Sequence, residues 1–249
     1  MSGHSKWATI KRKKAATDQA RGKLFSKYIK EITLAARHGG ADPDANPRLR
    51  TAINAAKAVN MPASNIDRAV KRGAGEVEGV RYEETQYEGY GPGGVALLVE
   101  VATDNRNRTA GDIRHIFTKA GGKLGEAGSV VHLFKPRGVI VVDKGAVAED
   151  ALMEIALEAG ADDVSAEGDV YEILTPPAQF EVVKEALASK GVPVQSADLT
   201  KLSSLQVLVE GREAETLLKL VDTLEDHDDV QKVYSNFNVS DEVMARLSR

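Results

Sequence analysis

The sequence predicts an α+β protein: an N-terminal three-helix domain followed by two ferredoxin-like (βαββαβ) α/β domains, one inserted in the other. Apolar residues follow a helical period up to residue 73, and strand patterns begin after the Gly/Glu-rich linker 73–79. Beyond the linker, a complete βαββαβ pattern lies between two incomplete halves. We therefore expect domains at 1–79, at 80–136 plus 203–249, and at 137–202. Three successive modules are the alternative, although an incomplete half cannot close a core by itself.

The first predicted helix covers residues 22–37, with its apolar residues on one face. The opposite face gathers Lys23, Lys27, Lys30 and Arg37, and only Glu31 interrupts the positive charge. A solvated helix face is one interpretation, but such faces normally mix charges of both signs. The pattern therefore favours a stripe that faces an anion such as nucleic acid.

Capping residues mark the next two helices. Asn46 is expected to cap a helix that has Pro47 at its first position and ends near residue 60. A third helix is expected to start at Ser64, with Asp67 completing a capping box, and to end at Gly73.

Arg68 and Arg72 share one face of the third helix and could contact a groove or phosphates. The alternative is the wet side of a small bundle. The turn before this helix superficially resembles a helix-turn-helix but lacks the usual glycine, so the pattern is a weak one.

Beyond the linker, strands and helices alternate. A strand is expected at 84–90, and the front half comprises strands at 95–103 and 129–135 and a helix at 109–120, capped by Thr109 and Asp112. The complete unit comprises strands at 138–143, 162–166, 169–175 and 193–200 and helices at 147–160 and 177–190. The back half comprises strands at 205–209 and 229–235 and a helix at 212–226. Residues 89–94 (Gly-Tyr-Gly-Pro-Gly-Gly) lead into a strand, which indicates a hairpin turn and not a phosphate loop.

The charge is divided unevenly along the chain. Residues 1–73 hold 16 Lys and Arg against 5 Asp and Glu, whereas the remainder holds 17 against 32, within a net charge of −4. A basic N-terminal part on an acidic body indicates a polyanionic partner such as DNA or ribosomal RNA. The acidic body could itself bind a ribosome or other basic proteins.

The N-terminal arm carries the densest positive charge, with Asp18 as its only acid. A solubilising tail is one interpretation, but the arm also holds the only tryptophan, which can stack on a base or dock the arm. We expect contact with nucleic acid, mostly through phosphates. The predicted contact residues of the arm and first helix are Lys6, Trp7, Lys11, Arg12, Lys13, Lys14, Arg21, Lys23, Lys27 and Lys30.

Two further charged clusters leave alternatives open. Arg106 and Arg108 precede a helix and could hold an anion or tie domains together. Residues 225–229 (Glu-Asp-His-Asp-Asp) place four acids at a helix end. A solvated turn is the simplest interpretation, and a basic partner or a loosely bound cation is the sharper one.

The composition excludes several classes of protein. Cysteine is absent, which excludes disulfides, thiolate zinc sites, iron–sulfur clusters and cysteine nucleophiles. No apolar run approaches the length of about 18 residues that a membrane span needs. Residues 1–20 lack the apolar region of a signal peptide. We expect a cytoplasmic monomer.

No catalytic or metal-binding pattern stands out. The five histidines show no ligand spacing, and neither HExxH nor a nucleophile elbow occurs. We therefore expect no catalytic residue, no metal and no cofactor. A hydrolase that uses carboxylates between domains is the competing class, and paired acids with raised pKa values in a cleft would distinguish it.

Several stretches resemble the YebC/PmpR family from one end of the chain to the other. The resemblance implies three domains, one inserted in another, and no enzymatic activity. It implies a probable transcriptional regulator that binds DNA, although relatives, including a mitochondrial translational activator, act in translation. The stretches are GHSKWATIKRKKAATDQARGKLFSKYIKEI, GGADPDANPRLRTAI, NMPASNIDRAVKRG, YEGYGPGGVA, DNRNRT, GGKLGEAGSV, LEAGADDV and LEDHDDVQKVY.

Overall fold

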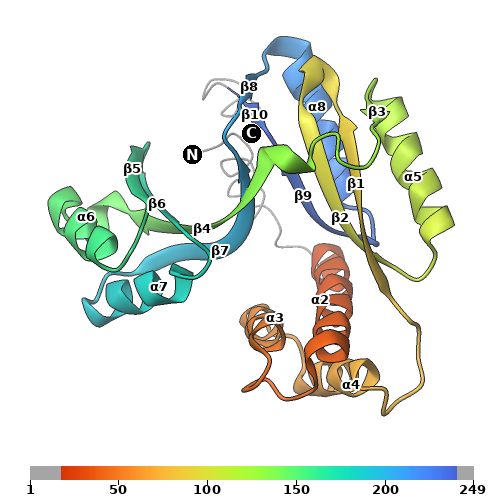
Figure 1. The fold of residues 1–249 in the computed structure, drawn as a ribbon, viewed down its shortest axis with the longest axis horizontal. Coiled ribbons are helices and arrows are strands. Elements are labelled where there is room, and N and C mark those ends of the chain that lie inside the picture. Colours follow the sequence, from red (N-terminus) through yellow and green to blue (C-terminus); the bar gives the residue numbers. More distant parts are fainter. Residues whose placement is uncertain (1–17, 240–249) are drawn as a thin grey trace.

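The computed structural model describes residues 18–239, and its N-terminal part is a bundle of three helices (Figure 1). The helices are α2 (Asp18–Gly39), α3 (Pro47–Ala58) and α4 (Ala63–Gly73). The predicted helical domain is therefore present. The buried residues of its core include Ile32, Ala35, Leu49, Ala56, Ile66 and Ala69.

The start of α3 is as predicted, whereas the start of α4 is not. Oδ1 of Asn46 accepts a hydrogen bond from the N–H of Leu49 at 3.1 Å, and Pro47 takes the first helical position. The predicted N-cap Ser64 is wrong, because α4 already begins at the residue before it and no side chain caps this helix. Pro62 precedes the helix with φ −57°, which leads the backbone directly into the first turn.

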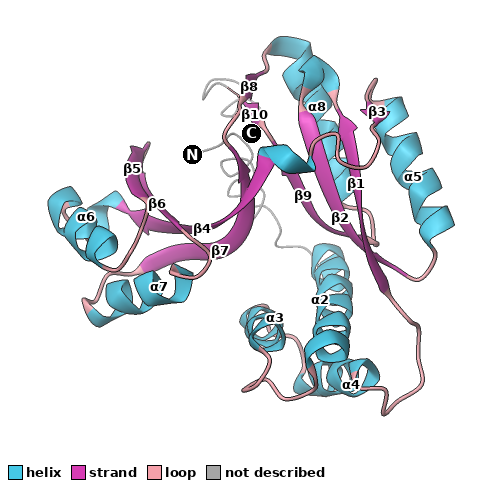
Figure 2. Ribbon diagram, viewed as in Figure 1, coloured by secondary structure: helices cyan, strands magenta, loops and turns pink. Residues whose placement is uncertain are grey.

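A four-stranded antiparallel sheet follows the helices, with the order β3-β1-β2-β9. Its strands are β1 (Glu83–Tyr90), β2 (Ala96–Thr103), β3 (Lys123–Leu124) and β9 (Val230–Ser235). Two helices, α5 (Arg106–Lys119) and α8 (Gly211–Glu225), lie against it (Figure 2). Leu97 and Val99 of β2 share a core with Phe117 of α5 and Leu217 of α8.

The turn between β1 and β2 is the predicted hairpin connection. A short 3₁₀ turn, η1 (Pro92–Gly94), joins the strands, and Gly93 and Gly94 have φ angles of 71° and 73°. Side chains other than glycine rarely adopt this region, which explains the run of glycines without any phosphate-binding role.

The second sheet has the order β5-β6-β4-β7 with antiparallel pairing throughout. Its elements, in chain order, are β4 (Phe134–Asp143), α6 (Glu149–Glu158), β5 (Asp163–Glu167), β6 (Val170–Thr175), α7 (Phe180–Ser189) and β7 (Val194–Ser203). This is the predicted βαββαβ unit. Ile140 and Ile173 of the sheet share its core with Leu152 of α6 and Leu187 of α7.

The first sheet departs from the expected βαββαβ order. Its chain order is ββαβ before the second sheet and αβ after it, so the β1–β2 hairpin forms the centre. The strand predicted at 129–135 is wrong: a 3₁₀ turn, η2 (Val131–Leu133), occupies most of it, and β4 begins only at Phe134.

A buried acid explains that difference. The carboxylate of Glu88 in β1 accepts hydrogen bonds from the N–H groups of Gly128, Val130 and Val131 at 2.7, 2.7 and 2.8 Å. These amides serve the carboxylate instead of a strand partner, which holds the segment as turns beside β1.

The chain leaves the first sheet and returns to it at one place. Phe134 and Ser203, at the ends of β4 and β7, are register partners. A short parallel pair, β8 (Val207–Leu208) with β10 (Phe237–Asn238), then leads back towards the first core. This closeness of the two ends suits an insertion, while the division into independently folding domains stays a prediction. No helix between residues 18 and 239 is long and apolar enough to span a membrane.

Candidate nucleic-acid interface

The lysines on one face of α2, Lys23, Lys27 and Lys30, reach the C-terminal end of α8; we call them the lysine stripe. Nζ of Lys27 donates to the carbonyl oxygen of Glu225 at 2.6 Å, and Nζ of Lys23 to that of Asp226 at 3.3 Å. The last carbonyls of a helix lack partners within it and carry partial negative charge. The lysine stripe therefore binds a helix end of its own chain.

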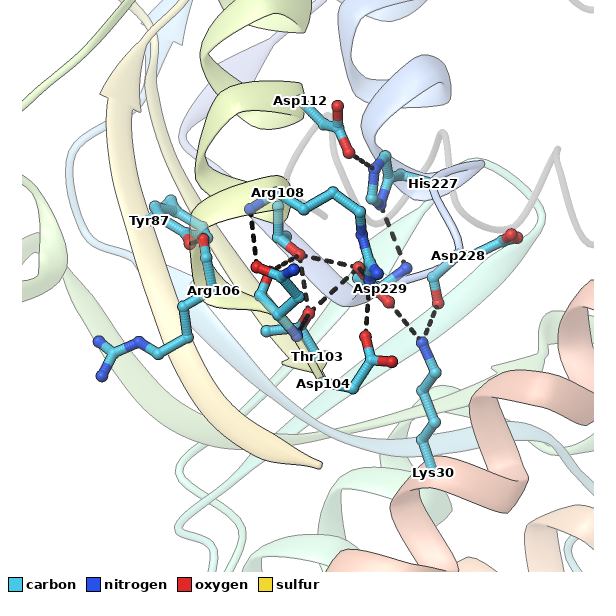
Figure 3. A network of polar contacts seen from close by, with 12 residues as sticks. Lys30, Tyr87, Thr103, Asp104, Arg106, Arg108, Asp112, His227, Asp228 and Asp229 are labelled. Carbon is cyan, nitrogen blue, oxygen red and sulfur yellow. Dashed lines mark hydrogen bonds and ion pairs between the residues drawn. The ribbon is translucent and has the colours of Figure 1, made fainter. Parts of the chain in front are cut away.

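Lys30 binds Asp229, in the turn between α8 and β9 (Figure 3). Its Nζ lies 2.7 Å from Oδ1 of Asp229 and 2.9 Å from the carbonyl oxygen of Asp228. Oδ2 of Asp229 accepts hydrogen bonds from Nη2 of Arg108 at 2.7 Å and from Oγ1 of Thr109 at 2.8 Å. One carboxylate thus joins α2 to α5 and to the first sheet.

The groups around Asp229 stabilise its ionised form. Burial by itself would raise its pKa, but the hydrogen bonds from Lys30, Arg108 and Thr109 outweigh burial and hold the pKa well below its usual value. The hydrogen bond to Asp229, with a second one to Asp104, raises the pKa of Arg108. The cluster is a fixed arrangement of opposite charges at neutral pH.

These contacts correct the expectation that Lys27 and Lys30 face nucleic acid. Their amines are engaged by residues 225–229, and the Lys30 side chain is only 10% exposed. Lys23 keeps 40% of its side chain exposed, so a phosphate contact there stays a prediction. Residues 225–229 are likewise more than a solvated turn, because the basic partner weighed as the alternative lies in the same chain.

Arg108 and Arg106 have different surroundings. Arg108 supports the contact between α2 and the turn after α8, because its partner Asp229 also binds Lys30. Nη2 of Arg106 lies 3.4 Å from Oγ1 of Thr85. The predicted capping box of α5 is wrong, since the helix begins at Arg106 and Thr109 donates to Asp229 instead.

Arg48 of α3 forms a second link between the helices and the sheet. Its Nε lies 2.8 Å from Oε1 of Glu31 in α2, and its Nη1 lies 3.2 Å from Oε2 of Glu84 in β1. The hydrogen bond from Arg48 lowers the pKa of Glu84. Arg48 has no predictive signal in the sequence, because a single arginine on a helix surface carries no sign of its partner.

Other arginines of the helical part adjoin a cavity of about 530 Å³. Arg37 of α2, Arg72 of α4 and Arg81 of the following linker line it, and we call it the arginine pocket. Arg68 and Arg72 line a smaller cavity of about 120 Å³. None of these four arginines forms an ion pair with a carboxylate of residues 18–239. Of the predicted contact residues, Arg68 and Arg72 thus have no carboxylate partner among the described residues. Arg37 and Arg81 lie beside them, and Nη1 of Arg37 donates to the carbonyl oxygen of Tyr82 at 3.1 Å.

Most of the predicted arm lies outside the described residues. Nothing is placed for Lys6, Trp7, Lys11, Arg12, Lys13 and Lys14, while Arg21 falls within α2. Their contact with nucleic acid stays a prediction.

Family models match the chain in two consecutive stretches. Residues 5–76 match the model described as the TACO1/YebC protein N-terminal domain, and residues 82–237 match the TACO1/YebC second and third domain. The chain belongs to the TACO1/YebC family. The expected family is thereby confirmed.

Curated TACO1/YebC relatives match over nearly their whole length. A "Probable transcriptional regulatory protein" of Desulfatibacillum aliphaticivorans is 60% identical over 98% of this chain and 99% of its own. One of Geobacter sulfurreducens is 58% identical over 99% of this chain and 100% of its own. The crystal structure of a conserved hypothetical protein from Aquifex aeolicus is similar with a TM-score of 0.80 and 49% identity, over 91% of this chain and 94% of that one.

The competing hydrolase would need paired acids with raised pKa values. Among the described residues, the hydrogen bonds to the carboxylates of Glu84, Glu88 and Asp229 hold their pKa values below the usual range. A general acid needs the opposite shift. Among the described residues, no three His, Asp or Glu side chains gather as a metal site.

Proposed function

We propose that this chain is a non-enzymatic, nucleic-acid-binding regulator of gene expression that acts on DNA through its basic N-terminal domain. The observation that carries the proposal is the set of arginines around α4 (Arg37, Arg68, Arg72 and Arg81) that lack a carboxylate partner among residues 18–239. Guanidinium groups bind phosphate well, because they are planar, always charged and weakly hydrated.

The contacts that the lysine stripe makes within the chain indicate which surface binds nucleic acid. Lys27 and Lys30 are already bound to residues 225–229, so α4, the N-terminal arm and the exposed part of Lys23 are left to attract a polyanion. The acidic remainder of the chain keeps other faces away from nucleic acid. We expect a cytoplasmic monomer without cofactor or metal.

The printed name of the relatives, "Probable transcriptional regulatory protein", supports DNA as the target. Binding to ribosomal RNA by the same surface, as a ribosome-associated translation factor, is the alternative, because contacts to phosphate do not depend on sequence.

One experiment separates the two targets: binding to duplex DNA and co-sedimentation with ribosomes, measured at matched salt with full-length protein. We expect duplex binding that weakens in Arg68→Ala for all sequences alike, with a salt slope shallower by about 1. The matched control is Arg114→Ala, an exposed arginine of α5 that removes the same charge elsewhere.

Co-sedimentation without duplex binding would replace DNA by ribosomal RNA as the target. Absence of both would overturn the proposed function.

A further inference from the structure

The arginine pocket has the size and charge of a ligand site. Its volume of about 530 Å³ lies within the range of about 300–1,000 Å³ that is usual for small-molecule sites. Arginine residues line it from three separate segments, α2, α4 and the linker after α4. Glu78 is the one carboxylate among the lining residues of the described chain. The positive charge therefore exceeds the negative charge at this place.

Apolar and aromatic groups line the same pocket. Val77 and Val80 are 41% and 46% exposed, although their neighbours in the pocket are charged. Tyr82 also lines it, and Nζ of Lys30 lies 5.4 Å from the centroid of the Tyr82 ring. A ligand that has only an anionic group would leave these surfaces wet, whereas a nucleotide also brings a flat base to cover them.

Arg72, at the wall of this pocket, has a hydrogen-bond donor without an acceptor. Its Nε is buried and has no acceptor. The linker backbone lies close upon it, since a Cβ built at Gly79 would stand 2.5 Å from that nitrogen. A buried donor without a partner costs free energy, and an anion that enters beneath the linker would supply the acceptor.

We propose that the arginine pocket binds one unpaired nucleotide of a single-stranded nucleic acid. Its phosphate lies against Arg37, Arg72 and Arg81, and its base lies against Tyr82 and the two valines. This inference rests on the proposed function and specifies the ligand of its surface. It adds a preference for single strands that phosphate contacts alone do not give.

The test measures how a labelled, 5′-phosphorylated hexanucleotide and a duplex bind to the full-length protein by fluorescence anisotropy. Tyr82→Leu removes the ring but keeps an apolar side chain, and Arg81→Ala removes an exposed charge of the pocket. We expect each substitution to weaken single-strand binding by about fivefold or more, which for Tyr82→Leu is the lower end of what one base stack contributes. The controls Tyr82→Phe and Arg114→Ala should bind single strands within about twofold of wild type. Tyr82→Leu should leave duplex binding unchanged.

A second measurement does not depend on any substitution. A hexanucleotide that carries one 4-thiouridine should form photo-cross-links to residues 72–82, and an excess of mononucleotide should reduce them. Melting temperatures confirm that each variant is folded, and if Tyr82→Leu fails to fold, Arg81→Ala decides.

Nucleotide binding in the arginine pocket would be overturned if Tyr82→Leu and Arg81→Ala both bound single strands as strongly as wild type. It would also be overturned if all cross-links lay outside residues 72–82. Either result would leave the proposed function intact. A wild-type protein that binds no nucleic acid would overturn the proposed function itself.

Discussion

At the scale of single residues, two buried carboxylates hold together segments that are distant in the sequence. Burial raises the pKa of Glu88, but three backbone amides outweigh it and bring the pKa below its usual value. Asp229 is held in the same way by Lys30, Arg108 and Thr109. Each acid is stable as a charge only because its partners surround it, so losing one partner leaves an uncompensated buried group.

The substitution Asp229→Asn should destabilise the protein by about 3–5 kcal/mol, because it leaves Lys30 buried without its counter-charge. The measurement is urea unfolding at pH 7, with Asp169→Asn on an exposed turn as the control. A double-mutant cycle with Lys30→Met isolates the pair, and we expect its coupling energy to be large. Equal stability of Asp229→Asn and the control would contradict the role assigned to this cluster.

Asp229 also determines the direction in which the stability of the protein changes with pH. Because the pKa of Asp229 is lower in the folded chain than in the unfolded one, its stabilising effect is complete above the unfolded value of about 4. The effect declines as the pH falls below that value and is lost as the pH passes through the folded pKa. Wild type should therefore lose more stability than Asp229→Asn between pH 5 and pH 2.

At the scale of elements, α2 illustrates what periodicity can and cannot predict. The pattern correctly places Lys23, Lys27 and Lys30 on one face, opposite the apolar residues. The inferred partner needs correction, because a row of lysines fits the end of a helix as well as it fits phosphates. Arg68 and Arg72 of α4 and Arg81 of the linker after it have no carboxylate partner among residues 18–239.

The basic arm gives a prediction at this scale. Replacing Lys11, Arg12, Lys13 and Lys14 by alanine should weaken nucleic-acid binding for all sequences and make the slope of log affinity against log salt shallower, by up to about 0.9 per lost phosphate contact. Lys27→Met is the informative comparison, since it should lower thermal stability and leave the slope unchanged. An unchanged slope in the arm variant would show that these residues do not contact phosphates.

At the scale of the whole molecule, the first sheet depends on the end of the chain. β9 pairs with β2 along its length, and Leu220, Val221 and Leu224 of α8 fill the core beside it. The second sheet lies between these parts in sequence but has its own core. Segments on both sides of the second sheet in the sequence therefore build the core of the first sheet, to which the second sheet contributes little.

A fragment of residues 1–202 should aggregate or melt without cooperativity, because it lacks β9 and α8 and exposes the apolar face of β2. Deleting residues 137–202 behind a short Gly/Ser linker should leave a folded protein, since Phe134 and Ser203 already lie side by side. Calorimetry and size-exclusion chromatography measure both. A soluble 1–202 fragment with a cooperative transition would refute the insertion.

The sequence by itself determined those features that depend on neighbouring residues. The cap of α3 at Asn46, the glycine turn at 91–94 and the βαββαβ unit all follow from local backbone preferences and periodic burial. Only the tertiary structure decided what faces each charged surface: Lys30 and Asp229 are far apart in sequence, as are Glu88 and the amides it binds. Periodicity identifies the face of an element, whereas the partner of that face depends on how distant segments pack, which no local pattern encodes.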